Sequence, residues 1–409
     1  MSTTILRDGE TAGLSVWKGA MLVCGTCIGG GMLAMPIQTA DSGFCIASLV
    51  LLASWIFMSY TGLLLVEATL WLRDQSHFST IAQALLGAPG RILSLIVYLF
   101  MNTASLVAYT SGGALLFDYW ITSLLGISLG YSMCCVLFTV LFGGLVSLGL
   151  AFISKVNSWF VLLMGVFYCY LVCLGLFHLR LDYLTFRPAW VQGLSCFPLI
   201  FAAFSHQMIV PSLCSYLNYN AAKLKKSILI GTAVPFAVYF LWLLIIHGII
   251  PFEGADGLHA AFENNSLIVE PFKVHFSNPT VFVVMDAFAF LALVTSYLGL
   301  SIALFDFVRD MFKGLGKYPR KETIIAVSIL PCLFLAMLFQ KALLNFLDAS
   351  GGFGDALLSG MIPVSMIWIG RYRRKYIGEY KVAGGKPALI GAGVFALAIF
   401  IIQWVKLFW

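Results

Sequence analysis

The sequence Gly25-Thr26-Cys27-Ile28-Gly29-Gly30-Gly31-Met32-Leu33-Ala34-Met35-Pro36 lies inside an apolar run, from Trp17 to Thr39, that is long enough to cross a bilayer. A helix in lipid must satisfy its own backbone hydrogen bonds, and three consecutive glycines followed by a proline favour a break instead. Broken backbone at membrane depth is tolerated only where it is buried in protein or lines a cavity. The stretch therefore predicts either an unwound segment that binds a ligand or a close helix–helix contact through small residues.

The composition of the chain excludes a soluble protein. Of the 409 residues 61% are hydrophobic and only 10% are charged, and the mean hydropathy is +0.96. These values predict an all-α polytopic membrane protein, a single transmembrane domain over residues 1–409. Cys24 and Cys27 form a C-x-x-C pair, but inside a lipid-spanning helix we interpret them as packing residues and expect no metal or cofactor.

The hydropathy pattern predicts eleven membrane spans joined by mostly short loops. Between the second and third spans, residues 78–86 have the pattern of a short amphipathic helix at the membrane surface. The predicted spans cover residues 17–39, 43–70, 92–118, 130–151, 156–177, 191–217, 227–250, 280–308, 322–340, 342–370 and 387–407.

The distribution of basic residues predicts the orientation. If the N-terminus is cytoplasmic, all but five of the 24 lysines and arginines fall on the inner side. The net charge of +6 therefore reflects membrane topology and gives no reason to expect a nucleic-acid partner. With eleven spans, the C-terminus is expected outside. The five basic residues on the outer side are Arg180, Arg187, Lys273, Lys341 and Lys406.

A second break is predicted in the middle of the sixth span. The run Phe204-Ser205-His206-Gln207 is polar at mid-membrane depth, and Pro211 follows it much as Pro36 follows the glycines. Spans one and six run in opposite directions and lie five spans apart. Two interrupted helices in corresponding positions indicate an inverted five-plus-five repeat, here residues 17–177 and 191–370 with an additional helix at 387–407.

The two breaks also predict a class of ligand. The N-terminal end of a half-helix carries partial positive charge and free N–H groups, which suit a carboxylate. The C-terminal ends and loosened carbonyls suit an ammonium group or a small cation. A site that combines both fits a zwitterion, such as an amino acid.

The first-span motif from Gly25 to Pro36 resembles that of the bacterial hydroxy/aromatic amino acid permeases. Pro211-Ser212-Leu213 with the basic loop that follows, the run Ala108-Tyr109-Thr110-Ser111-Gly112-Gly113 and residues 292–307 are also similar to that family. The resemblance implies a LeuT-type fold with broken helices one and six, in the bacterial inner membrane. It also implies secondary active import of an aromatic amino acid, tyrosine in the first place and tryptophan in the second. Family members often have a Phe-Gly-Phe-His type of run where this chain has Phe204-Ser205-His206-Gln207.

We expect the substrate to lie between the two breaks. Backbone groups of the first break would hold its main chain. Two of the candidates have an alternative to contact with the substrate. His206 would instead be a neutral imidazole that satisfies a freed carbonyl, and Tyr109 would be an ordinary packing residue. The substrate-binding candidates are Thr26, Gly29, Gly30, Gly31, Tyr109, Phe204, Ser205 and His206.

The coupling ion is open between H⁺ and Na⁺. A buried carboxylate costs about 3 kcal/mol on insertion scales, which makes Asp355 at the middle of span ten the first candidate for proton coupling, with Asp348 two turns away. Some proton-driven relatives place a lysine in span five, and residues 156–177 contain no lysine or arginine. Serine and threonine also commonly hydrogen-bond between packed helices, which is the alternative role for Thr295 and Ser296. The candidates for a sodium site are Gly25, Ile28, Ala292, Thr295 and Ser296.

The sequence thus predicts a cation-coupled importer of an aromatic amino acid. A sodium-coupled carrier of other neutral amino acids is the alternative within the same fold. The sequence contains no H-E-x-x-H, no G-x-S-x-G and no phosphate-binding loop, so we expect no enzymatic activity. A channel is the third interpretation, and the oligomeric state is left open.

Overall fold

The computed structural model describes residues 15–73, 77–148, 150–264, 266–276, 278–314, 316–340 and 342–408. Every regular element in these ranges is helical. Ten helices are long and apolar enough to cross a membrane, and one bent pair provides an eleventh span. The prediction of an all-α membrane protein with about eleven spans is confirmed, with boundaries that mostly agree within a few residues.

The first six spans begin with the bent pair. They are α1 (Val16–Cys27) with α2 (Gly31–Gln38), α3 (Gly43–Trp71), α4 (Phe78–Leu125), the run of α5 (Tyr131–Phe138), η1 (Thr139–Gly143) and η2 (Val146–Leu148), α6 (Leu150–His178), and α7 (Trp190–Ala203) with η4 (Gln207–Ile209) and α8 (Val210–Tyr216).

The remaining five spans include one that winds largely as a π-helix. They are α9 (Ala221–Ile249), α12 (Pro279–Gly314), α13 (Lys321–Leu338), the run of α14 (Leu343–Ala349), η5 (Ser350–Met361), α15 (Ile362–Trp368) and η6 (Ile369–Arg373), and α16 (Gly385–Phe408). Outside the spans lie η3 (Leu181–Leu184), α10 (Leu258–Glu263) and α11 (Val269–Val274).

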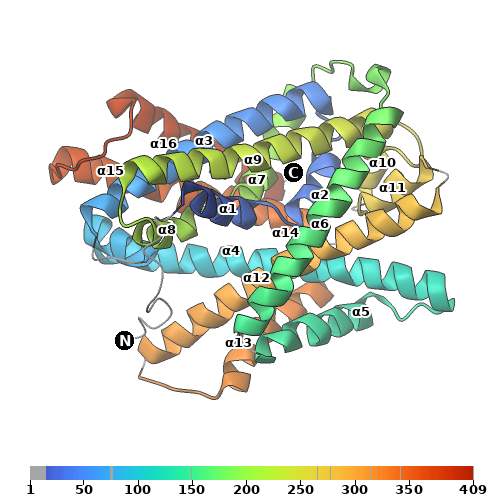
Figure 1. Cartoon of the computed structure of the whole chain (residues 1–409), viewed down its shortest axis with the longest axis horizontal. Coiled ribbons are helices and arrows are strands. Elements are labelled where there is room, and N and C mark those ends of the chain that lie inside the picture. The colour runs from blue at the N-terminus through green and yellow to red at the C-terminus, as the bar shows by residue number, and fades with distance from the viewer. Residues whose placement is uncertain are drawn as a thin grey trace.

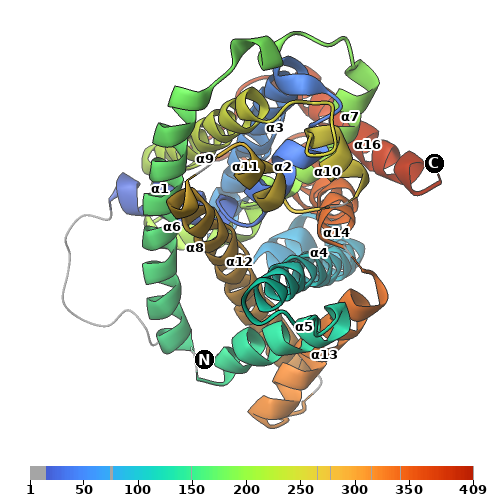
Figure 2. The same cartoon turned by 90° about the vertical axis from the view of Figure 1, so that its right-hand side faces the viewer.

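Most spans run along the long axis of the molecule, which is horizontal in Figure 1. The short helices α10 and α11 lie at its right-hand end, which we call the loop end. The α8–α9 turn and the connection between α15 and α16 lie at the left-hand end, which we call the basic end because Lys223, Arg373 and Arg374 lie there. Figure 2, seen from the loop end, shows α10 and α11 in front of the bundle.

The amphipathic helix predicted for residues 78–86 is present as the first part of α4. Gly87 has φ +79° and ψ −168°, a conformation that favours glycine, and it separates this part from the membrane-spanning part of α4. Phe78, Ile81 and Leu85 are buried. Their spacing gives the short helix one apolar face, and that face packs on the protein.

Span one is broken as predicted, with a bend of 56° between α1 and α2. Residues 28–30 are not helical. The two halves differ in their surroundings, because every residue of α2 is buried, whereas α1 packs mainly on α9 and is exposed along one face. A Cβ atom added at Gly231 of α9 would lie 2.6 Å from Cβ of Val23, so glycine permits the close approach of α1 and α9.

Two ion pairs tie the last two spans to the bundle, a buried one between span ten and α3 and a half-buried one between α16 and span ten. At the basic end Arg371 Nε donates to Glu67 Oε1 at 2.7 Å, and the backbone N–H of Val382 donates to Glu67 Oε2 at 2.7 Å. On α16, Lys406 Nζ lies 2.5 Å from Asp348 Oδ2 and 3.0 Å from the carbonyl oxygen of Ser195. Charges with several partners of this kind are tolerated inside a membrane bundle, because each is compensated where it is buried.

Candidate functional site

The glycines of the first break lie between α12 and α4. The backbone N–H of Gly30 donates to Ser296 Oγ at 2.9 Å, and that hydroxyl donates to the carbonyl oxygen of Ala292 at 2.9 Å. A Cβ atom at Gly30 would lie 2.6 Å from Cε1 of Tyr109, and one at Gly29 would collide with Ser296 Oγ. Both roles considered for the glycines are therefore present, because these residues interrupt the helix and also allow close packing around the break.

Tyr109 and Gly31 complete the surroundings of this break. The Tyr109 side chain is buried, with its ring against Gly30. A Cβ atom at Gly31 would be 3.6 Å from Cβ of Ala203, the last residue of α7. The structure thus brings the two breaks side by side, with Tyr109 adjacent to the first.

The three candidates in the second break point in different directions. The Phe204 ring lies edge-to-face on Tyr239, with 5.4 Å between the ring centroids. Ser205 Oγ donates to Asp355 Oδ1 at 2.7 Å. His206 turns toward α3, where its Nε2 atom approaches Gly62, while its Nδ1 atom lies 2.8 Å from the carbonyl oxygen of Phe204. Ser205 therefore connects this break with span ten, whereas His206 satisfies a carbonyl that the break has freed.

Tyr239, which the sequence reasoning did not single out, lies between the two breaks. Its hydroxyl donates to the carbonyl oxygen of Cys27 at 2.6 Å and lies 3.1 Å from the carbonyl oxygen of Ala203. These carbonyls belong to the last residues of α1 and α7. The available signal was a tyrosine within the apolar span seven, where a polar group needs a partner.

Asp355 is fully buried in the π-helical part of span ten. Its Oδ1 atom accepts hydrogen bonds from Ser205 Oγ at 2.7 Å and from Ser359 Oγ at 2.6 Å, and Oδ2 has no partner among the described residues. Asp348, the second carboxylate candidate, is paired with Lys406. Asp348 Oδ1 also lacks a partner among the described residues, so of these two candidates it is the hydrogen bond to a break that distinguishes Asp355.

The candidates for a sodium site are only partly brought together. Ser296 reaches the break, but the Thr295 hydroxyl donates to its own helix, at the carbonyl oxygen of Ala292, over 3.3 Å. Thr26 is exposed and its hydroxyl donates to the carbonyl oxygen of Val23 at 2.7 Å. Gly25 is also exposed, and apart from the backbone of its own helix nothing lies within 4 Å of where its Cβ atom would be. Ile28 is half-buried beside them.

The exposed face of α1 leads to the first break. Its members recur at helical spacing from the basic end inward: Trp17, Lys18, Met21, Leu22, Gly25 and Thr26. On the opposite side of the break, α2 is wholly buried and is covered by α10. One face of α1 is therefore exposed up to the break, whereas α2 is enclosed by its neighbours.

Ion pairs at the loop end fasten the short helices over the bundle. His259 Nδ1 of α10 lies 2.7 Å from Oδ1 of Asp41, which follows α2. The hydrogen bond with the Asp41 carboxylate raises the pKa of His259 above its ordinary value of 6.5. On α11, Lys273 Nζ lies 2.5 Å from Asp286 Oδ1 and 3.3 Å from Tyr119 Oη. Helices α2, α4 and α12 are thereby linked to their cover.

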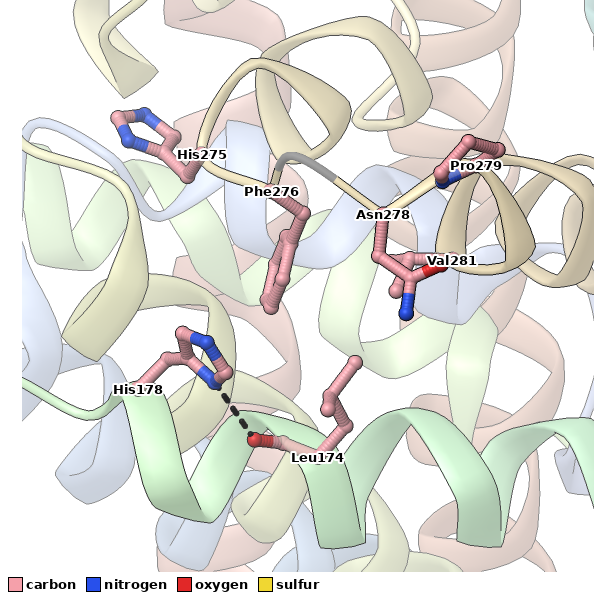
Figure 3. Close-up of a pocket in the computed structure, with 7 residues that line it drawn as sticks. All are labelled: Leu174, His178, His275, Phe276, Asn278, Pro279 and Val281. Carbon is pink, nitrogen blue, oxygen red and sulfur yellow. Dashed lines mark hydrogen bonds between the residues drawn. The ribbon is translucent and has the colours of Figure 1, made fainter.

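A pocket of about 530 Å³ lies at the loop end, away from the breaks. It is lined by the end of α6, the residues after α11 and the start of α12. The Phe276 ring packs on that of His178, with 4.8 Å between the centroids, and Figure 3 shows the His275 ring apart from both. The His178 ring is already hydrogen-bonded to the carbonyl oxygen of Leu174, 3.1 Å away. In the described part of the chain no group of three or more histidine, cysteine or acidic side chains is placed to hold a metal ion, and these two histidines form no exception.

Comparison with known proteins places this geometry among amino acid permeases. Residues 13–405 match the tryptophan/tyrosine permease family. The chain is 31% identical to the tyrosine-specific transport system 1 of Haemophilus influenzae, over 90% of this chain and 92% of that protein. It is 27% identical to the low affinity tryptophan permease of Escherichia coli, over 92% of each chain. A crystal structure of MhsT in complex with L-phenylalanine superposes with a TM-score of 0.66 at 16% identity, over 96% of this chain and 99% of that one.

Proposed function

The chain belongs to the tryptophan/tyrosine permease family, and from that premise we propose that it imports an aromatic amino acid by secondary active transport, with tyrosine as the first substrate and tryptophan as the second. Its fold is of the LeuT type, an all-helical membrane architecture in which spans one and six are interrupted. The tyrosine and tryptophan permeases among its relatives support the substrate class. The proposal goes beyond these likenesses in the order of substrates and in the coupling ion.

The observation that carries the proposal is the convergence of the two breaks. The end of α1 and the end of α7 meet at Tyr239, and the start of α2 lies against Ala203. Half-helix ends of both signs therefore lie close together, as recognition of a zwitterion requires. We assign the substrate's main-chain groups to Thr26 and residues 29–31, and its ring to the neighbourhood of Tyr109 and Phe204.

Alternating access supplies the transport step. In the arrangement described here one face of α1 is exposed, whereas α2 is buried and covered by α10. We assign this arrangement to the inward-facing state, with the basic end in the cytoplasm. The concentration of basic residues at that end supports the assignment, because cytoplasmic loops carry an excess of lysine and arginine.

We propose that protons drive the uptake and that Asp355 carries them. A buried carboxylate whose second oxygen is unpaired is costly to keep charged, and binding a proton removes that cost. The Ser205 hydroxyl connects the carboxylate to the second break. A change in the protonation of Asp355 therefore acts directly on a segment that lines the substrate position.

Sodium coupling is the second candidate, with other neutral amino acids as substrates. The observation in its favour is Ser296, whose hydroxyl lies between the backbone of the first break and the carbonyl oxygen of Ala292. Oxygen ligands of this kind suit a hard cation. In this arrangement the same hydroxyl already satisfies Gly30.

Uptake by purified protein in proteoliposomes tests the function. Labelled tyrosine is supplied outside with an inward pH gradient, with or without sodium, and each of the other amino acids is added in excess. We expect competition by tryptophan, no requirement for sodium, and collapse of uptake with a protonophore. Uptake that follows the sodium gradient and ignores the protonophore would replace proton coupling by the site around Ser296.

A further inference from the structure

A single buried hydroxyl contacts the ends of both broken helices. Tyr239 has no exposed surface, and it comes from α9, which is continuous from Ala221 to Ile249. Its hydroxyl oxygen lies 2.6 Å from the carbonyl oxygen of Cys27 and 3.1 Å from that of Ala203. The Phe204 ring lies edge-to-face against the Tyr239 ring and so holds its orientation. The hydroxyl is thus placed at the point where α1 and α7 both end.

The two ends that meet at this hydroxyl have the same electrostatic sign. α1 ends at Cys27 and α7 ends at Ala203, and both are C-terminal helix ends, which carry partial negative charge and carbonyls without helical partners. Inside a membrane protein no bulk water is available to satisfy these carbonyls. Two such ends side by side require a donor or a positive charge between them. In broken-helix transporters, this is a position where half-helix ends and freed carbonyls coordinate a cation.

We propose that the Tyr239 hydroxyl takes the place of a bound cation between the ends of α1 and α7. Its O–H proton bridges the two carbonyl ends, so this position needs no monovalent ion and ties both breaks to α9. The complementary end is served in the same way, because the backbone N–H at the start of α2 donates to the Ser296 hydroxyl. Neutral side-chain groups from α9 and α12 therefore compensate both kinds of helix end. The inference rests on the proposed transport function and adds a positioning residue to it.

The test replaces Tyr239 by phenylalanine, which keeps the ring and removes the hydroxyl. Tyr297→Phe is the matched control, because Tyr297 of α12 is also fully buried and its hydroxyl has no partner in the described part of the chain. Each purified protein is measured in choline, sodium and lithium chloride at equal ionic strength. The two readouts are the melting temperature in detergent and the initial rate of tyrosine uptake in proteoliposomes.

In choline chloride, we expect Tyr239→Phe to melt below the unmodified protein and to lose about tenfold in initial rate, because two helix ends lose their donor. Sodium or lithium should enter the vacated position. In these salts the variant should therefore come closer to the unmodified protein, both in melting temperature and in initial rate, than it does in choline. Tyr297→Phe should show no ion-specific change. A purely structural loss would be equal in all three salts.

Two results would overturn the inference. The first is a Tyr239→Phe protein that melts and transports like the unmodified protein in choline. The second is a loss of the same size in choline, sodium and lithium. Failure of the transport proposal gives a different pattern: the unmodified protein takes up no aromatic amino acid, while the melting temperatures still report whether an ion replaces the hydroxyl.

Discussion

Asp355 illustrates how one residue can join two parts of the mechanism. It lies in span ten, yet its carboxylate receives a hydrogen bond from Ser205 in the second break. Ser359, one turn further along the same span, occupies the same carboxylate oxygen. The other oxygen has no partner in the described ranges, which is where a proton can bind.

Asp355→Asn should abolish accumulation of tyrosine against its gradient and retain exchange of external for internal tyrosine. The amide keeps the shape and its contacts with Ser205 but cannot release a proton. Accumulation ratios under a pH gradient and counterflow in proteoliposomes measure the two activities separately.

Asp348→Asn is the contrasting variant, because Asp348 is paired with Lys406 and belongs to the anchoring of α16. That change should lower the melting temperature and leave coupling intact in the protein that remains folded. An Asp355→Asn protein that still concentrates tyrosine would remove Asp355 from the proton route.

The ion pair of His259 with Asp41 makes the stability of the folded protein depend on pH. The hydrogen bond with Asp41 raises its pKa above 6.5, so the folded protein binds this proton more tightly than the unfolded chain does. The resulting stabilisation is complete at a pH below the pKa of His259 in the unfolded chain, and it is lost as the pH rises through the pKa in the folded protein. The melting temperature of the unmodified protein should exceed that of His259→Gln by about 1–2 °C near pH 6, because the pair is half-exposed, and converge with it near pH 9.

His275→Gln provides a control of opposite sign. Burial lowers the pKa of His275, so the folded protein binds this proton less tightly than the unfolded chain does. Its contribution to stability is therefore fully present at a pH above the pKa of the unfolded chain and is lost as the pH falls. A melting-temperature difference for His259→Gln that is constant from pH 6 to pH 9 would exclude the ion pair between α10 and Asp41 as a pH-dependent contact.

The broken element of span one combines two properties that are usually separate. Its glycines lie where other chain segments approach within contact distance, and its backbone donates to Ser296. A branched side chain at this point conflicts with both properties, since it would overlap neighbours and oppose the unwound conformation.

Gly30→Val should lower uptake by about a hundredfold, because a displacement of about 1 Å at a binding site has an effect of that size. The added Cβ atom would lie 2.6 Å from Tyr109 and 3.2 Å from Leu293. Gly165→Val in α6 is the control, because no other atom lies within 4 Å of its Cβ position. Membrane content and gel-filtration profiles confirm insertion. Wild-type uptake by Gly30→Val would leave the glycines with a packing role only.

Sequence reasoning located the elements better than the contacts inside them. Long apolar runs define spans because a bilayer has a fixed thickness, and Gly29 to Gly31 and Pro211 mark breaks because their backbone chemistry is distinctive. The partners of Ser205, His206 and Tyr239 depend on which faces of distant helices meet. Hydropathy does not encode that information, so the Tyr239 bridge and the Glu67–Arg371 pair were not foreseen.

At the scale of the whole molecule, charge is distributed unequally between the two ends. Basic residues concentrate in the α8–α9 turn and in the connection between α15 and α16, whereas the loop that carries α10 and α11 contains Glu253, Asp256, Glu263 and Glu270. Figure 1 shows these segments at opposite ends of the bundle.

This asymmetry predicts a cytoplasmic N-terminus and an external C-terminus. Alkaline phosphatase, which folds only outside the cytoplasm, should be active when fused after α16 and inactive when fused after α15, with a fluorescent protein giving the converse result. Phosphatase activity after α15 combined with none after α16 would reverse the assignment of the two ends.

The pairing of Lys406 with Asp348 has a consequence for the order in which the protein is made. Lys406 follows Asp348 by 58 residues, so the ribosome delivers the acid to the membrane well before its counter-charge. Until α16 has entered the bilayer, the carboxylate of Asp348 lacks the basic partner with which it is paired in the folded protein. Packing around span ten is therefore complete only once the final helix is in place, and a chain that lacks Lys406 is expected to be less stable because it leaves a buried carboxylate without its partner.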